Sequence, residues 1–113
     1  MTLGDVVAAL SLEVRTSNPD LGGEVAGVYL SDLLSDVIGN SKAGYLWVTM
    51  QVHLNIVAVA SLKGLSAIIL VNGRTPNEET LRRAEAEGVV IAVSGLPAYE
   101  VAGRLYSLGL RCS

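Results

Sequence analysis

The sequence is poor in the residues that build disulfides, metal sites and nucleic-acid surfaces. Its 113 residues include one cysteine, Cys112, and one histidine, His53. A single cysteine cannot form an internal disulfide, which agrees with a reducing compartment, and no clustered ligand motif supports a metal site. Only 17% of the residues are charged and the net charge is −3. We therefore expect no metal and no nucleic-acid partner, because a phosphate backbone needs a basic surface.

Long apolar runs and an export signal are also missing. The apolar residues come in runs of about 5 to 8, far short of the roughly 20 that span a bilayer. The amino end, MTLGDVVAAL, has no basic flank and carries Asp5 where a signal peptide has no charge. We expect a protein that does not enter membranes and that resides in the cytoplasm.

The motifs that mark common enzyme sites are missing as well. The segment GNSKAGYL imitates a phosphate-binding loop, but Tyr45 and Leu46 follow its last glycine, where such a loop needs Lys and Ser or Thr. The sequence has no GxGxxG run for a dinucleotide. Asp32 and Asp36 could share one helix face, for which we favour a cap and a solvated surface. We expect no catalytic residues and no cofactor.

The composition favours one globular domain that spans residues 1–113. Half of the residues are hydrophobic, enough for one packed core in a chain too short for two domains. So much apolar side chain in so small a domain leaves some of it for a partner. Since most soluble oligomers are symmetric homo-oligomers, we expect a homodimer.

The pattern of apolar residues and turn residues predicts alternating helices and strands. Helices are predicted at 2–10, 31–38, 55–63, 78–87 and 97–108, and strands at 12–15, 24–30, 45–50, 67–71 and 89–93. Residues 16–23 have turn chemistry and form a loop. Strands that alternate with helices through short loops predict an α/β fold with a mainly parallel sheet and flanking helices.

The helix boundaries rest on specific capping residues. Thr2, Ser31 and Asn77 stand where a side-chain oxygen can accept from the free N–H groups of a first turn. Gly39–Asn40 is expected to stop the second helix, and Pro97 suits the first turn of the last one.

Polar residues follow three of the predicted parallel strands. In open parallel sheets, ligands bind outside the carboxyl ends of the strands, where the loops converge. We expect the guanidinium N–H groups of Arg74 to bind an anion. The Asn72-Gly73 backbone is expected to approach the anion closely, and His53 to lie opposite Arg74. The alternative is that these residues only make turns and caps. The candidate ligand-binding residues are Gln51, His53, Asn55, Asn72, Gly73, Arg74 and Ser94.

At these residues the chain resembles a known family. A short amino-terminal helix, a strand running into VYLSDLLSDVIGN, the strand GYLWVTMQVHLN, a helix, the strand AIILVNGR and a polar helix follow one another as in the DRTGG domain. This domain occurs in the kinase/phosphorylase of the phosphocarrier protein HPr and in some phosphotransacetylases and pyrophosphatases. The resemblance covers roughly Leu3 to Leu108 and implies the fold of the amino-terminal domain of that kinase.

Two departures from the family limit what the resemblance carries. Where the family has an Asp-Arg pair, this chain has VHLN at 52–55, so a ligand contact made by that pair does not transfer. Where the family has Thr-Gly-Gly, the chain has VNG at 71–73, which keeps one glycine for the tight turn. The element order is also similar, more distantly, to the uridine-binding amino-terminal domain of Mur ligases. In that domain a Ser-Arg or similar pair lies near the position of Ser31-Asp32.

The resemblance implies an accessory domain that dimerises beside catalytic or nucleotide-sensing domains. Our first hypothesis is a non-catalytic regulatory module that binds a small anionic or nucleotide-like metabolite at the strand ends. The second is a protein-interaction subunit that docks onto an enzyme partner. A small enzyme is the third hypothesis.

Overall fold

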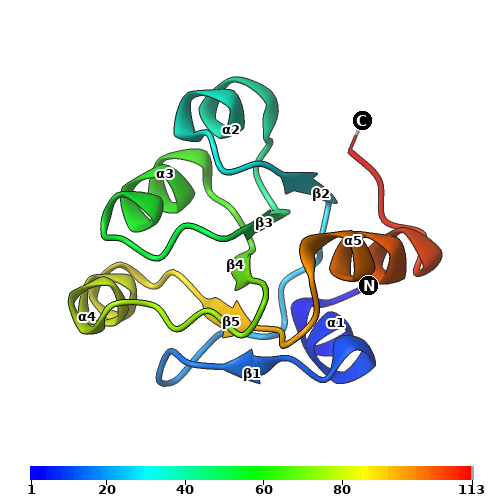
Figure 1. Ribbon diagram of the computed structural model, residues 1–113, viewed down its shortest axis with the longest axis horizontal. Coiled ribbons are helices and arrows are strands. Elements are labelled where there is room, and N and C mark those ends of the chain that lie inside the picture. The colour runs from blue at the N-terminus through cyan, green and yellow to red at the C-terminus, as the bar shows by residue number, and fades with distance from the viewer. Residues whose placement is uncertain (113) are drawn as a thin grey trace.

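A five-stranded sheet lies between two layers of helices in the computed structural model, which describes residues 1–112 (Figure 1). The strand order is β1-β5-β4-β3-β2. Strands β2 to β5 are parallel to one another, and β1 pairs antiparallel with β5. The predicted α/β class with a mainly parallel sheet is confirmed. The strands are β1 (Glu13–Val14), β2 (Gly27–Leu30), β3 (Tyr45–Thr49), β4 (Ala67–Leu70) and β5 (Ile91–Val93).

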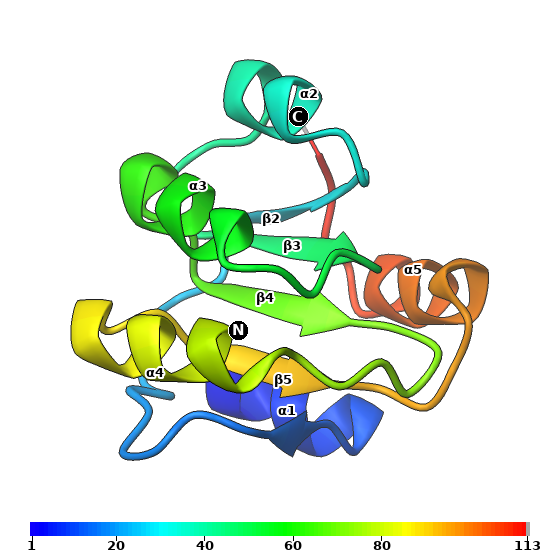
Figure 2. The same ribbon diagram turned by 60° about the vertical axis from the view of Figure 1, so that its left-hand side comes forward.

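The helices divide between the two faces of the sheet. Figures 1 and 2 show α1 and α5 on one face and α2, α3 and α4 on the other. Each parallel strand feeds a helix that returns across the sheet, so the strand ends and the helix starts lie at one edge. The helices are α1 (Leu3–Leu10), α2 (Leu34–Asn40), α3 (Asn55–Lys63), α4 (Glu78–Glu87) and α5 (Ala98–Ser107).

Alternation along the central strands builds two separate apolar clusters. Leu46 and Val48 of β3 pack toward α1 and α5, while Trp47 between them packs toward α2, α3 and α4. In β4, Ile69 joins the first cluster and Ile68 the second. Because both faces are covered, these strands are apolar at nearly every position.

Several predicted helix ends are confirmed in detail. The Thr2 side chain accepts from the N–H of Asp5, and the Asp5 carboxylate accepts from the N–H of Thr2, which completes a capping box at the start of α1. Helices α3 and α4 have the predicted bounds. They end at Gly64 and Gly88, whose φ angles of +64° and +71° belong to the left-handed region.

The second helix differs from its prediction. It begins at Leu34 and includes Gly39 and Asn40, which were expected to stop it. Ser31 does not cap it. Its hydroxyl accepts from the N–H of Leu33 in a local turn at 3.1 Å. Short polar side chains stabilise such turns as readily as helix starts, so the sequence pattern could not separate the two.

The helix start also changes the role of two carboxylates. Asp32 lies before α2, so it does not share a helix face with Asp36. The Tyr29 hydroxyl donates to the Asp36 carboxylate at 2.8 Å, and Asn40 donates to the same oxygen at 2.8 Å. The bond from Tyr29 is the main reason that the pKa of Asp36 lies below its ordinary value and that of Tyr29 above. This contact ties α2 to β2.

Two other predicted helix starts are realised differently. Asn77 is the N-cap residue of α4, but its side chain makes no capping hydrogen bond. Pro97 is the N-cap of α5 rather than a residue of its first turn. Strands β1, β2 and β5 are each shorter than predicted by two or three residues. The difference lies at the start of β2 and β5 and at both ends of β1.

The two outer edges of the sheet are both short or covered. Strand β1 has two residues. On the opposite edge, the N–H of Val28 in β2 donates to the carbonyl of Arg111 at 3.0 Å, so the carboxyl-terminal segment lies along β2. None of the helices between residues 1 and 112 is both long and apolar enough to cross a bilayer.

Candidate ligand-binding site

The loops after β4 and β5 join each other beyond the sheet. The N–H of Gly73 donates to the carbonyl of Ser94 at 2.8 Å, and the N–H of Asn72 donates to the carbonyl of Leu96 at 2.9 Å. The Ser94 side chain is buried, and its hydroxyl accepts from the N–H of Leu96 at 3.1 Å. Of the predicted site residues, Asn72, Gly73 and Ser94 therefore lie together.

The turn after β4 has an unusual backbone. Asn72 and Gly73 have φ angles of +58° and +64°, the left-handed region that Gly adopts freely and Asn tolerates. Both residues are exposed, and a Cβ at Gly73 would meet nothing within 4 Å. The turn thus presents main chain to solvent, as close approach by a ligand requires.

The loop after β3 joins the same edge from the other side. The Asn72 amide donates to the Met50 sulfur at 3.2 Å, and the Gln51 amide donates to the Asp32 carbonyl at 3.1 Å. Gln51 therefore spans toward β2. The loops that follow β2, β3, β4 and β5 form one continuous surface.

Asp32 is a residue of this edge that the sequence prediction missed. Its carboxylate accepts from the Thr49 hydroxyl at 2.7 Å and from the N–H of Met50 at 2.8 Å. The signal was its position directly after the β2 strand, the same position that identified the other candidates. Assigning it to a helix face hid that signal.

His53 and Asn55 lie on the α4 side of the edge. The His53 Nδ1 is 2.9 Å from the Asn77 side-chain nitrogen, so the side chain expected to cap α4 contacts the histidine instead. Asn55 is the first residue of α3 and is exposed. Both residues follow β3 as predicted: Asn55 begins α3, and His53 lies two residues before it, against the N-cap residue of α4.

Arg74 is exposed next to the left-handed turn. Its N–H donates to the Val71 carbonyl at 3.1 Å, which fixes the backbone. Within residues 1–112, its guanidinium makes no ion pair and no hydrogen bond. The charge is therefore available to an anion, at the place where the loops meet.

Four helices begin at this edge without a side-chain cap. These are α2, α3, α4 and α5, whose N-cap residues are Leu33, Leu54, Asn77 and Pro97. By contrast, α1 begins with a complete capping box formed by Thr2 and Asp5. Uncapped first-turn N–H groups carry partial positive charge. Together with Arg74, they make this edge favourable for negative charge.

Comparison with known proteins finds a likeness in structure. No family profile and no curated protein matches the chain. A solved structure does match, that of the CBS and DRTGG domains of the regulatory region of Clostridium perfringens pyrophosphatase, complexed with its activator diadenosine tetraphosphate. The TM-score is 0.72 with 16% sequence identity, and the match covers 92% of this chain.

The match establishes the fold. The chain spans 45% of the length of the pyrophosphatase region, as a single domain of a multidomain regulatory segment does. The resemblance to DRTGG domains that the sequence indicated is confirmed for the fold.

Proposed function

We propose that this protein is a non-catalytic regulatory module that binds a small anionic or nucleotide-like metabolite at the carboxyl ends of β3, β4 and β5. One observation carries the proposal: the guanidinium of Arg74, which has no partner within residues 1–112, lies beside the exposed left-handed turn at Asn72 and Gly73. An arginine fork recognises the oxygens of phosphate and carboxylate, and the N–H groups of Asn72, Gly73 and Arg74 hold the turn in place by donating to carbonyls of the chain. The uncapped starts of α3 and α4 add partial positive charge.

The structural comparison supports a nucleotide-like ligand. The pyrophosphatase regulatory region, of which this chain matches 45%, is complexed with an activator, diadenosine tetraphosphate. That compound belongs in the first set of ligands to be tried here. A cytoplasmic location and a homodimer remain parts of the proposal.

Thermal unfolding in the presence of candidate ligands tests the proposal. We expect a nucleotide or phosphorylated metabolite, with diadenosine tetraphosphate, pyrophosphate and phosphate among the probes, to raise the unfolding temperature. A ligand at about 100 times its Kd adds roughly 2.7 kcal/mol, which is several degrees for a domain of this size. If none of the panel stabilises the protein at millimolar concentration, the ligand-sensing proposal is wrong.

Substitution of Arg74 locates the site. Arg74→Ala is expected to abolish the ligand-induced shift and to change the stability of the free protein by less than about 0.5 kcal/mol, because the side chain is exposed and unpaired. Arg82→Ala is the matched control, since Arg82 is an exposed α4 arginine that pairs with Glu78. Ligand binding that survives Arg74→Ala unchanged would place the site elsewhere.

A docking subunit is the second candidate, and one observation favours it. Leu30, Leu33 and Met50 are 46%, 64% and 38% exposed at the same edge. Adjacent exposed apolar side chains are typical of a surface that meets another protein. Pull-down of an enzyme partner in the absence of any metabolite, together with unchanged thermal stability across the ligand panel, would support docking over sensing.

A further inference from the structure

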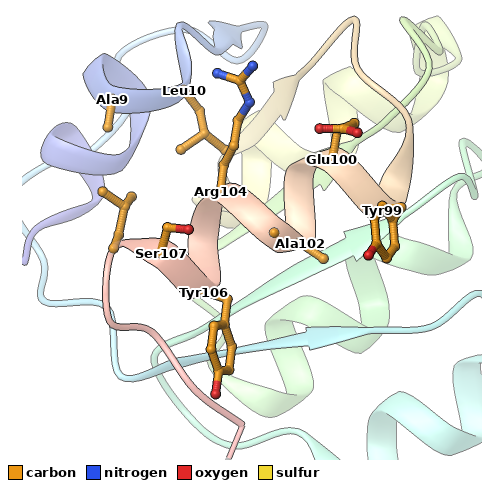
Figure 3. A pocket seen from close by; sticks show the side chains of 10 residues that line it. Ala9, Leu10, Tyr99, Glu100, Ala102, Arg104, Tyr106 and Ser107 are labelled. Carbon is orange, nitrogen blue, oxygen red and sulfur yellow. The ribbon is translucent and has the colours of Figure 1, made fainter.

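The outward face of α5 carries two largely exposed tyrosines, Tyr99 and Tyr106. The Arg111 guanidinium covers one face of the Tyr106 ring, 3.6 Å from its centroid. Tyr99 is 86% exposed and Tyr106 is 61% exposed, and a bulky aromatic side chain so exposed is uncommon. Figure 3 shows Tyr99 and Tyr106 along α5, with Ala102 between them. An open hollow of about 710 Å³ lies over this face, bounded on the far side by Ala9 and Leu10 of α1. Helices α1 and α5 therefore form this face together.

Gly103 lies at the centre of this face, and neither its backbone conformation nor its packing within residues 1–112 requires a glycine there. A glycine inside a helix costs about 1 kcal/mol relative to alanine. Its backbone does not need positive φ, and a Cβ there would meet nothing within 4 Å. The side chain is missing where the described residues leave open space. Such a position allows another backbone or a bulky side chain to approach closely.

Glu100 and Arg104 flank Gly103 as a charged row. They are four residues apart on α5, the spacing at which Glu followed by Arg pairs well. Helix α4 realises this spacing in Glu78–Arg82 and Arg83–Glu87, at 3.4 Å and 3.2 Å. Glu100 and Arg104 form no such ion pair within residues 1–112, and Figure 3 shows both on the same side of α5. Both charges are therefore available to a partner.

We propose that this face of α5 binds the same face of a second copy of the chain, with the two helices antiparallel about a two-fold axis near Ala102 and Gly103. The sequence of α5 is self-complementary in this arrangement. Positions 100 and 104 are symmetric about position 102, so Glu100 of each copy meets Arg104 of the other. Tyr99 and Tyr106 are symmetric about the point between 102 and 103, so each Tyr99 meets Tyr106 of the other copy.

The two-fold axis determines which side chains of the two α5 helices face each other. A two-fold axis between antiparallel helices brings each flank against the same flank of the partner. The charged row of Glu100 and Arg104 thus faces its own copy, with opposite charges opposed, and the tyrosine flank faces its own copy. The small residues Ala102 and Gly103 lie between, where the helices are closest. A stable dimer buries about 800 Å² from each partner, more than ten helical residues offer, so the α1 surface around Ala9 belongs to the interface.

The inference rests on the proposed homodimer and is independent of the ligand site, since α5 is not among the residues expected to hold the anion. Light scattering after gel filtration, over a range of protein concentrations without ligand, tests it. The wild-type chain is expected to have twice the 11.8 kDa of one copy. Glu100→Arg and Arg104→Glu are each expected to give the mass of one copy, because like charges then face each other twice.

The double variant Glu100→Arg/Arg104→Glu decides the question. It restores opposite charges across the two-fold axis, so the mass of two copies should return, which a simple failure to fold would not allow. Gly103→Gln provides a second measurement: circular dichroism should show an intact fold while the mass falls to one copy. Arg83→Glu, on α4, is the matched control and should remain a dimer.

Three results would overturn the inference. A wild-type mass of one copy at every concentration removes the dimer. A dimer that tolerates both single charge reversals has another interface. A double variant that stays at one copy, with its fold intact, shows that Glu100 and Arg104 do not face each other.

Discussion

At the scale of single residues, Gly27 is the position where the chain tolerates no side chain at all. It is buried in β2, between the ring of Tyr45 and the carboxyl-terminal segment. A Cβ at this position would lie 2.5 Å from the Arg111 carbonyl oxygen and 2.6 Å from the Tyr45 ring. The carbonyl belongs to backbone, so it cannot turn aside as the end of a flexible side chain can.

Gly27→Ala should therefore destabilise the protein by about 1–3 kcal/mol, the usual cost of overpacking. Gly39→Ala is the matched control, because Gly39 lies within α2 and a Cβ there meets nothing within 4 Å. That change should leave stability unchanged or raise it by up to about 1 kcal/mol. Urea titration of both variants checks the opposite signs, and equal effects would contradict the packing described for Gly27.

Asp32 provides a second prediction at this scale. Its carboxylate is the acceptor for the hydroxyl of Thr49, a residue only 2% exposed. Asp32→Ala removes that acceptor and also the acceptor for the N–H of Met50, so we expect a loss of about 1–3 kcal/mol. Asp20→Ala should cost less, because the Asp20 carboxylate accepts from the N–H of Gly22 in an exposed loop. Denaturant midpoints of the two variants that coincide would show that Asp32 does not hold the loops together.

At the scale of elements, the carboxylates of Asp5 and Glu85 connect local structure to acid sensitivity. The N–H of Thr2 donates to Asp5 at 2.9 Å and is the main reason that the pKa of Asp5 lies below its ordinary 3.8. The N–H of Ser17 donates to Glu85 at 2.7 Å and lowers the pKa of Glu85 below 4.5. A carboxylate with a lowered pKa in the folded state stabilises that state once both states are ionised.

This stabilisation should be fully present above the ordinary pKa of each group and should be lost as the pH falls through the lowered values. We expect the unfolding temperature to be insensitive to these groups near neutrality and to fall below about pH 4. Asp5→Asn should make that fall shallower, because Asn does not titrate. Calorimetry from neutral pH to pH 2 measures the difference; identical slopes for Asp5→Asn and wild type would show that the capping box carries no ionic contribution.

The elements also show what local sequence can predict. Helix α3 was predicted with its observed bounds because Asn55–Lys63 is apolar at helical spacing and Gly64 adopts the left-handed conformation that ends it. The start of α2 was predicted wrongly, since Ser31 and Asp32 use their side chains in contacts before the helix. The Asn77 side chain turns toward His53, 24 positions earlier. Contacts with distant parts of the chain decided these cases, and a local pattern cannot register them.

At the scale of the whole molecule, the sheet joins two apolar clusters that share no side chain. Ile68 and Ile69 are adjacent in β4 but belong to opposite clusters. Trp47, the only tryptophan, is fully buried in the cluster of α2, α3 and α4, and its indole N–H donates to the Ser31 carbonyl at 2.8 Å. Its fluorescence therefore reports on one face of the sheet alone.

Both faces should nevertheless unfold together, because β2, β3, β4 and β5 each contribute to both clusters. Ile68→Ala and Ile69→Ala should each cost about 2–5 kcal/mol. In both variants, tryptophan fluorescence and far-ultraviolet circular dichroism should show coincident transitions. Leu62→Ala, at a side chain 72% exposed, is the control and should have little effect. A fluorescence transition that ignores Ile69→Ala would show that the two layers unfold independently.

The strand order was the part of the fold that the sequence could not supply. The pattern predicted five strands, and β1 was not distinguished from the parallel strands although it pairs antiparallel with β5. A strand of two residues has too little sequence pattern to show whether it pairs parallel or antiparallel. The candidate site was predictable to the extent that parallel strands end at one edge, which brought Asn72, Gly73 and Ser94 together.

The covered edges of the sheet bear on the behaviour of the protein at high concentration. An exposed edge strand offers its unpaired main chain as a template for strands of other molecules, which is the first step toward fibres. Here one edge ends in the two residues of β1, and the Arg111 carbonyl occupies the N–H of Val28 on the other. We therefore expect the carboxyl-terminal segment to limit aggregation, because its removal would leave the N–H of Val28 free to pair with a strand of another molecule.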